Sequence, residues 1–127
     1  MPVINIKSLP LEKHFKTSEI LIKLCTQLAE KSGYKPEHVW AYWEFLLPGN
    51  YAVGNKTAST QTADSHSPII KILSFEGNSQ EKIIRMMETT AAIISEELKI
   101  DIGNIFIEYS EAYSGRVFDG GAVVFSK

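Results

Sequence analysis

The chain has 127 residues, of which 44% are hydrophobic and 22% charged, and its formal net charge is -2. These values are typical of one globular domain that is large enough to bury a core. The small charge and the presence of only two arginines, Arg85 and Arg116, argue against nucleic acid, phosphate-rich ligands or anionic membranes as partners. A single cysteine, Cys25, excludes an internal disulfide. The sequence has no signal-peptide pattern and no apolar run of membrane length, so we expect a cytoplasmic protein.

The first half of the chain predicts a strand followed by a helix. Residues 2–9 alternate apolar and polar side chains, as a half-buried strand does. Residues 17–32 have apolar side chains on one helical face, and either Thr17 or Ser18 can cap the helix. Gly33 is the expected end of this helix, because glycine readily adopts the left-handed conformation found there.

A second strand is expected over residues 39–45, and the polar segment 55–67 is expected to be an exposed linker. Because side chains alternate across a strand, the second strand has two different faces. One face has Trp40, Tyr42 and Glu44, and the other has Val39, Ala41, Trp43 and Phe45.

The pattern of the first half returns 66 residues later. Pro68-Ile69-Ile70-Lys71-Ile72-Leu73-Ser74 matches Pro2-Val3-Ile4-Asn5-Ile6-Lys7-Ser8, and Ile105-Phe106-Ile107 matches Val39-Trp40-Ala41. Between them we expect a helix capped by Asn78, with Glu81 completing a capping box. Its predicted apolar stripe is Ile83, Ile84, Met87, Ala91, Ile94 and Leu98. One offset without gaps indicates an internal repeat of residues 2–54 and 68–120 within a single domain, 1–127.

Two β-α-β units predict an α+β fold with two layers. Each unit should have parallel strands and a right-handed crossover, and together they should form a four-stranded mixed sheet with two helices on one face. No remaining segment of the sequence is expected to cover the other face of the sheet, although it is apolar enough to need cover. We therefore expect oligomerisation to hide this open face.

Pro2 follows the initiator methionine, which is normally removed when a small residue such as proline comes next. Removal would leave a secondary amine at the start of the first strand. A free α-amino group has a pKa of about 7.7–8.0, and burial lowers it because the charged form is disfavoured. Such an amine is neutral at working pH and can act as a general base. The alternative is that Met-Pro is simply a common way for a chain to begin.

Taken with these motifs, the chain resembles the tautomerase superfamily, in the double-unit form shared by macrophage migration inhibitory factor and 5-carboxymethyl-2-hydroxymuconate isomerase. Its second half, 68–121, is similar to a subunit of 4-oxalocrotonate tautomerase in Pro-Ile-Ile-Lys-Ile-Leu-Ser-Phe-Glu-Gly and Ser-Gly-Arg-Val-Phe-Asp-Gly-Gly. The resemblance implies a homotrimer and a catalytic Pro2 in a pocket lined partly by a neighbouring subunit. It also implies a small enol or 2-oxo acid substrate and no cofactor. The nitrogen of Pro68 lies in a peptide bond, so one active site per chain is expected.

The residues that grip the substrate in these relatives are not retained. Asn78 stands at the position of the first arginine of 4-oxalocrotonate tautomerase, and Tyr34 at that of the active-site lysine of the inhibitory factor. A dicarboxylate substrate of the usual kind is therefore not expected. The substrate-binding candidates that remain are Arg116, Lys35, Trp40, Phe106, Tyr113 and Phe118.

These candidates have different expected roles, each with a structural alternative. Arg116 or Lys35 would hold a substrate carboxylate, unless both are ordinary surface cations. Trp40, Phe106 and Phe118 would form pocket walls or belong to the packing, and Tyr113, or Tyr51, would donate a hydrogen bond to an enolate oxygen or lie at an oligomer interface. Glu44 and Glu108 are further acid or base candidates. The three histidines show no ligand spacing, so no metal is expected.

The leading hypothesis is a cofactor-free tautomerase or isomerase in which Pro2 moves a proton α to a carbonyl. A related alternative uses a protonated Pro2 as general acid for hydration or dehalogenation. The alternative from another class is a non-catalytic trimer, an interaction protein that keeps the scaffold without the chemistry.

Overall fold

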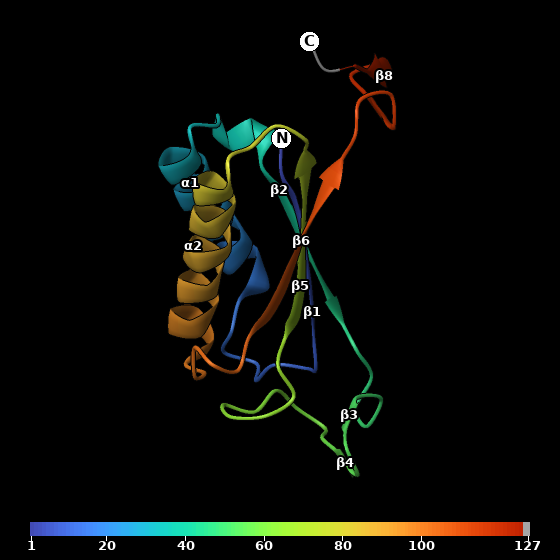
Figure 1. Ribbon diagram of the computed structural model, residues 1–127. Coiled ribbons are helices and arrows are strands. Elements are labelled where there is room, and N and C mark those ends of the chain that lie inside the picture. The colour runs from blue at the N-terminus through green and yellow to red at the C-terminus, as the bar shows by residue number, and fades with distance from the viewer. Residues whose placement is uncertain (126–127) are drawn as a thin grey trace.

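The computed structural model describes residues 1–125 and has two layers, a four-stranded sheet with two helices on one of its faces (Figure 1). The central strands are β1 (Val3–Ser8) and β5 (Ile69–Phe75), and the edge strands are β2 (Trp40–Phe45) and β6 (Phe106–Ala112). β1 is parallel to β2, β5 is parallel to β6, and the two central strands are antiparallel. This is the mixed α+β sheet that the repeat predicts.

Helix α1 (Thr17–Ser32) has the predicted bounds but a different cap. Lys16 takes the N-cap position, and no side chain accepts a hydrogen bond there. The expectation of a Thr17 or Ser18 cap was wrong, because Thr17 is already the first helical residue. The predicted end is confirmed: Gly33 is left-handed, with φ 77°, and its N–H bonds to the carbonyl of Ala29.

Helix α2 (Gln80–Leu98) is capped by Ser79, whose hydroxyl accepts a hydrogen bond from the Lys82 N–H at 3.2 Å. The predicted Asn78 cap was wrong by one residue. The Asn78 amide is engaged elsewhere, because it donates to the Ser74 hydroxyl at 3.3 Å and to the Tyr109 hydroxyl at 3.0 Å. Serine, one position further on, is an equally good cap.

The predicted apolar stripe of α2 was partly wrong. Ile94 and Leu98 are buried as expected, but Ile84 is 41% exposed and Met86 is fully buried. The buried face also includes two threonines, because the Thr90 hydroxyl donates to the Met86 carbonyl at 2.8 Å and so needs no water. The buried face of α2 is therefore rotated slightly about the helix axis from the face that hydrophobicity alone predicts.

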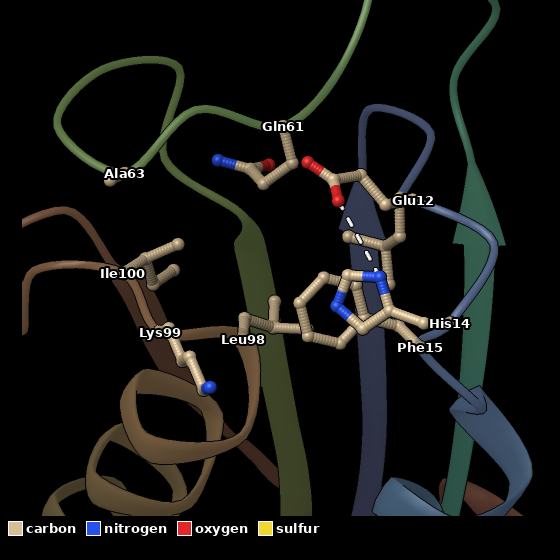
Figure 2. Close-up of a pocket in the computed structure, with 9 residues that line it drawn as sticks. Glu12, His14, Phe15, Gln61, Ala63, Leu98, Lys99 and Ile100 are labelled. Atoms are coloured by element: carbon tan, nitrogen blue, oxygen red, sulfur yellow. Dashed lines mark ion pairs between the residues drawn. The ribbon is translucent and has the colours of Figure 1, made fainter.

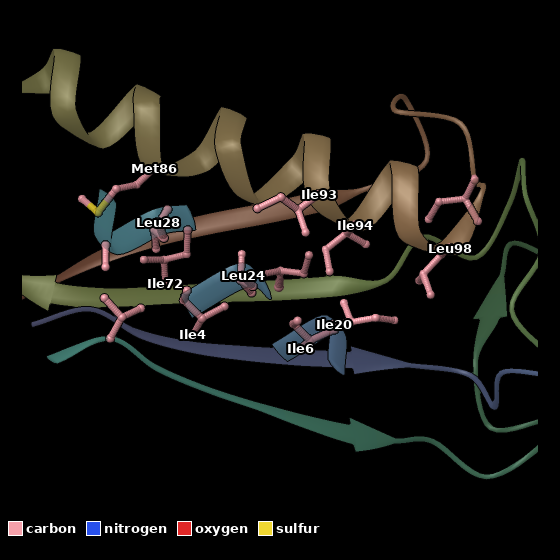
Figure 3. Close-up of a cluster of buried hydrophobic side chains, with 14 residues drawn as sticks. Ile4, Ile6, Ile20, Leu24, Leu28, Ile72, Met86, Ile93, Ile94 and Leu98 are labelled. Carbon is pink, nitrogen blue, oxygen red and sulfur yellow. The ribbon is translucent and has the colours of Figure 1, made fainter. Parts of the chain in front are cut away.

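The core lies between the central strands and the two helices (Figure 3). The inward side chains of the central strands are completely buried isoleucines, and the helices contribute leucines, isoleucines and a methionine. Burying each such side chain stabilises the fold by about 1.5–3 kcal/mol. The fully buried members are Ile4, Ile6, Ile70, Ile72, Leu24, Leu28, Met86 and Ile94.

Two short hairpins extend beyond the sheet at opposite ends (Figure 1). The first joins β3 (Ala52–Val53) to β4 (Lys56–Thr57), and the second, the C-terminal hairpin, joins β7 (Val117–Asp119) to β8 (Ala122–Val124). Glycines with positive φ form the turn of the second hairpin, Gly120 at 64° and Gly121 at 89°, as tight hairpin turns require.

The segment between β4 and β5 is packed in part, around His66, so the expectation of an exposed linker was wrong in part. His66 is only 5% exposed, and its ring nitrogens lie 3.0 Å from the Ser65 hydroxyl and 3.1 Å from the Lys56 carbonyl. Asn104 donates to the carbonyls of Thr62 and Ser65. The polar side chains of this segment satisfy one another, which allows it to lie against the body of the protein.

The face of the sheet opposite the helices is uncovered in the single chain. Trp40, Tyr42 and Phe106 on this face are 46%, 49% and 56% exposed. Three aromatic side chains in this state leave a large apolar surface in contact with water. Within residues 1–125, no helix is both long enough and apolar enough to cross a membrane.

Candidate active site

Pro2 lies completely buried at the start of β1. β1 is held on both sides by neighbouring strands, and the Trp40 N–H donates to the Pro2 carbonyl at 3.0 Å. The repeat preserves this arrangement, because the Phe106 N–H donates to the Pro68 carbonyl at 3.1 Å. These hydrogen bonds fix the start of β1, so the residue that precedes Pro2 lies at this end of the sheet.

The α-amino group of Met1 lies at this end of the sheet. Its pKa is below the ordinary value, mainly because burial disfavours the charged amine and also because the positive charge of Lys82 repels it. The Asp119 carboxylate raises the same pKa, a smaller effect. An amine, a cation from α2 and an anion from β7 therefore interact at the end of the sheet where Pro2 lies.

Lys82 is held in place by its own helix and by the end of the other helix. Its N–H bonds to the Ser79 cap, and its ammonium group lies 4.2 Å from the centre of the Tyr34 ring. A cation over an aromatic ring gains about 0.5–1 kcal/mol at exposed sites. Lys82 was not predicted from the sequence, although Tyr34 at the position of a relative's lysine indicates that the cation has to come from elsewhere.

The surroundings of Met1 are apolar and tight. A cavity of about 30 Å³ is lined by Met1, Val3, Leu73, Ala112 and other residues of the strand ends. A neighbouring hollow of about 170 Å³ shares Phe75 and Ala112 and continues to Ser114 and Val124 at the base of the C-terminal hairpin. While Met1 is present, the space beside Pro2 is far below the about 300–1,000 Å³ of usual ligand pockets.

Tyr113, Arg116 and Phe118 lie at or on the C-terminal hairpin, which extends from the same end of the sheet as the N-terminus (Figure 1). Tyr113 and Phe118 are 59% and 72% exposed, and Arg116 is also exposed. None of the three lines either cavity beside Met1. In the single chain these candidates share an end of the molecule with Pro2 without closing over it.

The remaining candidates are divided between the two ends of the sheet. Trp40 pairs with Val3 next to Pro2, and Lys35 is exposed just before the short 3-10 helix Pro36–His38. Phe106 pairs with Ile69 at the opposite end. One chain therefore brings Trp40, but not Phe106, to its own Pro2.

Two other candidates from the sequence have structural partners. The Tyr51 hydroxyl donates to the Ser67 carbonyl at 2.8 Å, at the Pro68 end of the sheet. Glu44 accepts a hydrogen bond from the Asn5 amide at 3.0 Å and lies 3.8 Å from the Lys7 ammonium. Burial raises the pKa of the Cys25 thiol, which makes it a poor nucleophile.

No group of three or more His, Cys, Asp or Glu side chains in residues 1–125 is arranged to hold a metal ion. The chemistry that this end of the sheet offers is that of an amine with a lowered pKa, an ammonium group nearby and apolar walls. Such an arrangement suits proton transfer on a small anionic molecule.

The backbone is closely similar to solved structures with the same two-layer repeat. A fused 4-OT, solved as an asymmetric trimer, superposes with a TM-score of 0.81 over 95% of this chain and 94% of its own, at 16% identity. The chain has the tautomerase superfamily fold. A macrophage migration inhibitory factor-like protein from Entamoeba histolytica superposes with a TM-score of 0.71, at 18% identity over 98% of both chains.

Another structure with this fold belongs to the cis-3-chloroacrylic acid dehalogenase family, with a TM-score of 0.74 and 11% identity over 96% of this chain and 82% of its own. The tautomerase fold thus supports more than one reaction among proteins similar to this chain. No protein-family model and no curated protein matches the amino-acid sequence. Superpositions at such low sequence identity establish the fold alone. The chemistry has to be argued from the residues of this chain.

Proposed function

We propose that the protein is a cofactor-free tautomerase, in which Pro2 acts as general base once Met1 has been removed. The observation that supports this best is the lowered pKa of the amine at the head of β1, caused by burial and by Lys82. Once Met1 is removed, the Pro2 nitrogen is the terminal amine at this end of the sheet, where burial and the charge of Lys82 favour its neutral form. It takes a proton from the carbon α to a carbonyl and returns it at another position, through an enol.

Lys82 is the cation that we propose for the substrate carboxylate. It acts on the charge of the terminal amine, whereas Arg116 and Lys35 are exposed and do not. Loss of Met1 also enlarges the small cavity that this residue now lines. A carboxylate between Lys82 and the Pro2 nitrogen places its own α-carbon next to the base.

The sign of the pKa shift favours a base over an acid. A hydratase or dehalogenase that uses protonated Pro2 needs an amine whose pKa is raised, so that it keeps its proton. Burial and Lys82 both lower the pKa of the terminal amine, and only Asp119 raises it. The general-acid alternative therefore has less support from this site.

We further propose a homotrimer, the assembly in which fused 4-OT was solved. The open sheet face and the two edge strands, β2 and β6, have no partner in the described chain. A neighbouring copy provides a way for Phe106, Tyr113 and Phe118 to reach the Pro2 of another chain. In this arrangement they would line the pocket, while Trp40 comes from the same chain as Pro2.

The test compares two forms of one protein, distinguished by intact mass. The form that begins at Pro2 should tautomerise a simple enol such as phenylenolpyruvate, and the form that retains Met1 should not, because its Pro2 nitrogen lies in a peptide bond. Pro2→Ala keeps a terminal amine and should retain part of the activity. Equal activity of both forms would rule out Pro2 as the base. An inactive but correctly processed trimer would favour the non-catalytic alternative.

A further inference from the structure

A hollow of about 300 Å³ at the opposite end of the sheet from Pro2 is not explained by the proposed function (Figure 2). We call it the linker hollow, and its lining includes Glu12, Phe15, Gln61, Leu98, Lys99 and Ile100. Its volume reaches the lower end of the about 300–1,000 Å³ that ligand pockets occupy. In the single chain it is thus larger than the space of about 30 Å³ beside Met1.

The repeat relates the linker hollow to the Pro2 region. Ile100 is the counterpart of Tyr34 and Glu12 is the counterpart of Asn78, each 66 residues away. The helix ends match as well, because the Tyr34 N–H bonds to Ala29 and the Ile100 N–H bonds to Ser95 in the same pattern. The hollow therefore lies at the Pro68 end, at the place that Tyr34 and Asn78 occupy at the Pro2 end. With no free amine there, it has no use in the proposed reaction.

Lys99 occupies a backbone position in this hollow that does not suit it. It ends α2 in the left-handed conformation, with φ 55°, where its counterpart in the first unit is Gly33. A side chain in this conformation carries a steric cost that glycine avoids. No hydrogen bond or ion pair engages the Lys99 side chain in residues 1–125. A strained residue with a free charge at the edge of a cavity indicates a role in binding.

Gln61 contributes a second unsatisfied group. Its amide nitrogen donates to the carbonyls of Thr62 and His66, which fixes which way the amide faces. The side-chain oxygen is left buried without a hydrogen-bond partner. A buried acceptor without a donor is unfavourable, so the wall of the hollow at Gln61 is not ideally packed.

The charges and the apolar floor of the hollow define a ligand class. Glu12 supplies a carboxylate, paired only with the exposed His14 at 3.5 Å, and Figure 2 shows it on the same side of the hollow as Gln61. Lys99 supplies the opposite charge from α2. Leu98 and Ile100, both nearly buried, lie between these groups. A matching ligand has a donor cation, an anion and a small apolar body.

We infer that the linker hollow binds a small zwitterion of the α-amino acid class. The ammonium group donates to the Glu12 carboxylate, and the carboxylate of the ligand meets Lys99. The side chain of the ligand covers Leu98 and Ile100. This inference does not depend on the proposed activity, because none of these residues takes part in it.

Calorimetric titration of the full-length protein with L-leucine tests the inference, with isovalerate and isoamylamine as probes that each lack one charge. Leucine should bind, and each analogue should bind about ten- to hundredfold more weakly, as the loss of a charged hydrogen bond predicts. The inference is overturned if leucine gives no heat at millimolar concentration, or if isovalerate binds as tightly as leucine.

Three variants separate the site from its surroundings. Glu12→Gln and Lys99→Gly should each weaken leucine binding at least about tenfold. Glu30→Gln changes an exposed carboxylate on α1, away from the hollow, and should leave leucine binding unchanged. Lys99→Gly should also relieve backbone strain, so we expect the variant to fold. Unchanged leucine binding by both pocket variants would contradict the proposed site.

Discussion

The Lys82 ammonium lies 4.2 Å from the centre of the Tyr34 ring, which joins the first turn of α2 to the end of α1. The same ammonium lowers the pKa of the terminal amine at the head of β1. The inhibitory factor has its lysine at the position of Tyr34, and here the cation comes from the other helix instead. A cation can thus stand at this end of the fold although its place in the sequence differs.

Lys82→Met should raise the KM of the processed protein for a carboxylate-bearing enol. The variant keeps the apolar stem over Tyr34 and removes the charge, so the expected loss is that of one charged hydrogen bond, about 1.5–3 kcal/mol or about ten- to hundredfold. Steady-state kinetics with phenylenolpyruvate measures the change.

Two further variants, one of a lysine and one of an arginine, are compared with Lys82→Met. Lys13→Met removes an exposed charge from the connector before α1 and should leave KM unchanged. Arg116→Ala tests the anchor that the sequence favours, and Lys82→Met should have the larger effect. If KM rises for Arg116→Ala alone, the substrate carboxylate binds at the C-terminal hairpin and not at Lys82.

The pH dependence of activity should move in opposite directions in two variants. A base is active when neutral, so activity should rise with pH through the pKa of the Pro2 amine, and we expect burial and Lys82 to hold this pKa below the usual about 7.7–8.0. Lys82→Met removes a charge that lowers the pKa, so the rise should move to higher pH. Asp119→Asn removes a charge that raises the pKa, so the rise should move to lower pH.

The profile of kcat/KM reports the free enzyme and is the measurement to use. Shifts of both variants in the same direction would show that the charges act through the general stability of the site. Identical profiles for all three proteins would show that the titrating group is not the amine at the head of β1.

The proposed trimer predicts a sedimentation-equilibrium mass of three times the 14.2 kDa chain. Tyr42→Lys and Phe106→Lys together add charge to both edge strands of the open face and should dissociate it. Ile22→Lys is the matched control, because Ile22 is 67% exposed on α1. A monomeric wild-type protein at micromolar concentration would remove the shared pocket.

The repeat made the fold predictable, because one offset matched strands, helices and turns at once. The buried sides of β1 and β5 follow from alternating isoleucines, and the end of α1 follows from Gly33. The helix caps were less predictable. Asn78 is a good cap by residue type, but its amide bonds to Ser74 and Tyr109, which no local rule reveals.

The site was less predictable than the fold, because its charges come from distant segments. Pro2 was evident from its position, whereas Lys82 depends on where α2 begins and on the ring of Tyr34. Phe106 was grouped with Trp40 because the repeat makes them equivalent, yet equivalent residues of two antiparallel units lie at opposite ends of the sheet. Sequence similarity between repeats therefore does not imply closeness in space.

The ends of the two helices provide a reciprocal test of backbone strain. Lys99→Gly should increase the free energy of unfolding by about 1 kcal/mol, because glycine adopts the left-handed conformation without the steric cost of a Cβ atom. Gly33→Lys should decrease it by a similar amount. A Cβ at Gly33 would have no atom within 4 Å, so a clash would not add to the backbone term.

Thermal or urea unfolding at one fixed protein concentration measures both changes, because the stability of an oligomer depends on concentration. A stabilised Lys99→Gly protein would show that lysine is kept at this position at a cost to folding. If Lys99→Gly is instead less stable, the Lys99 side chain makes a favourable contact that outweighs its strain. The strain would then no longer support a binding role for this residue.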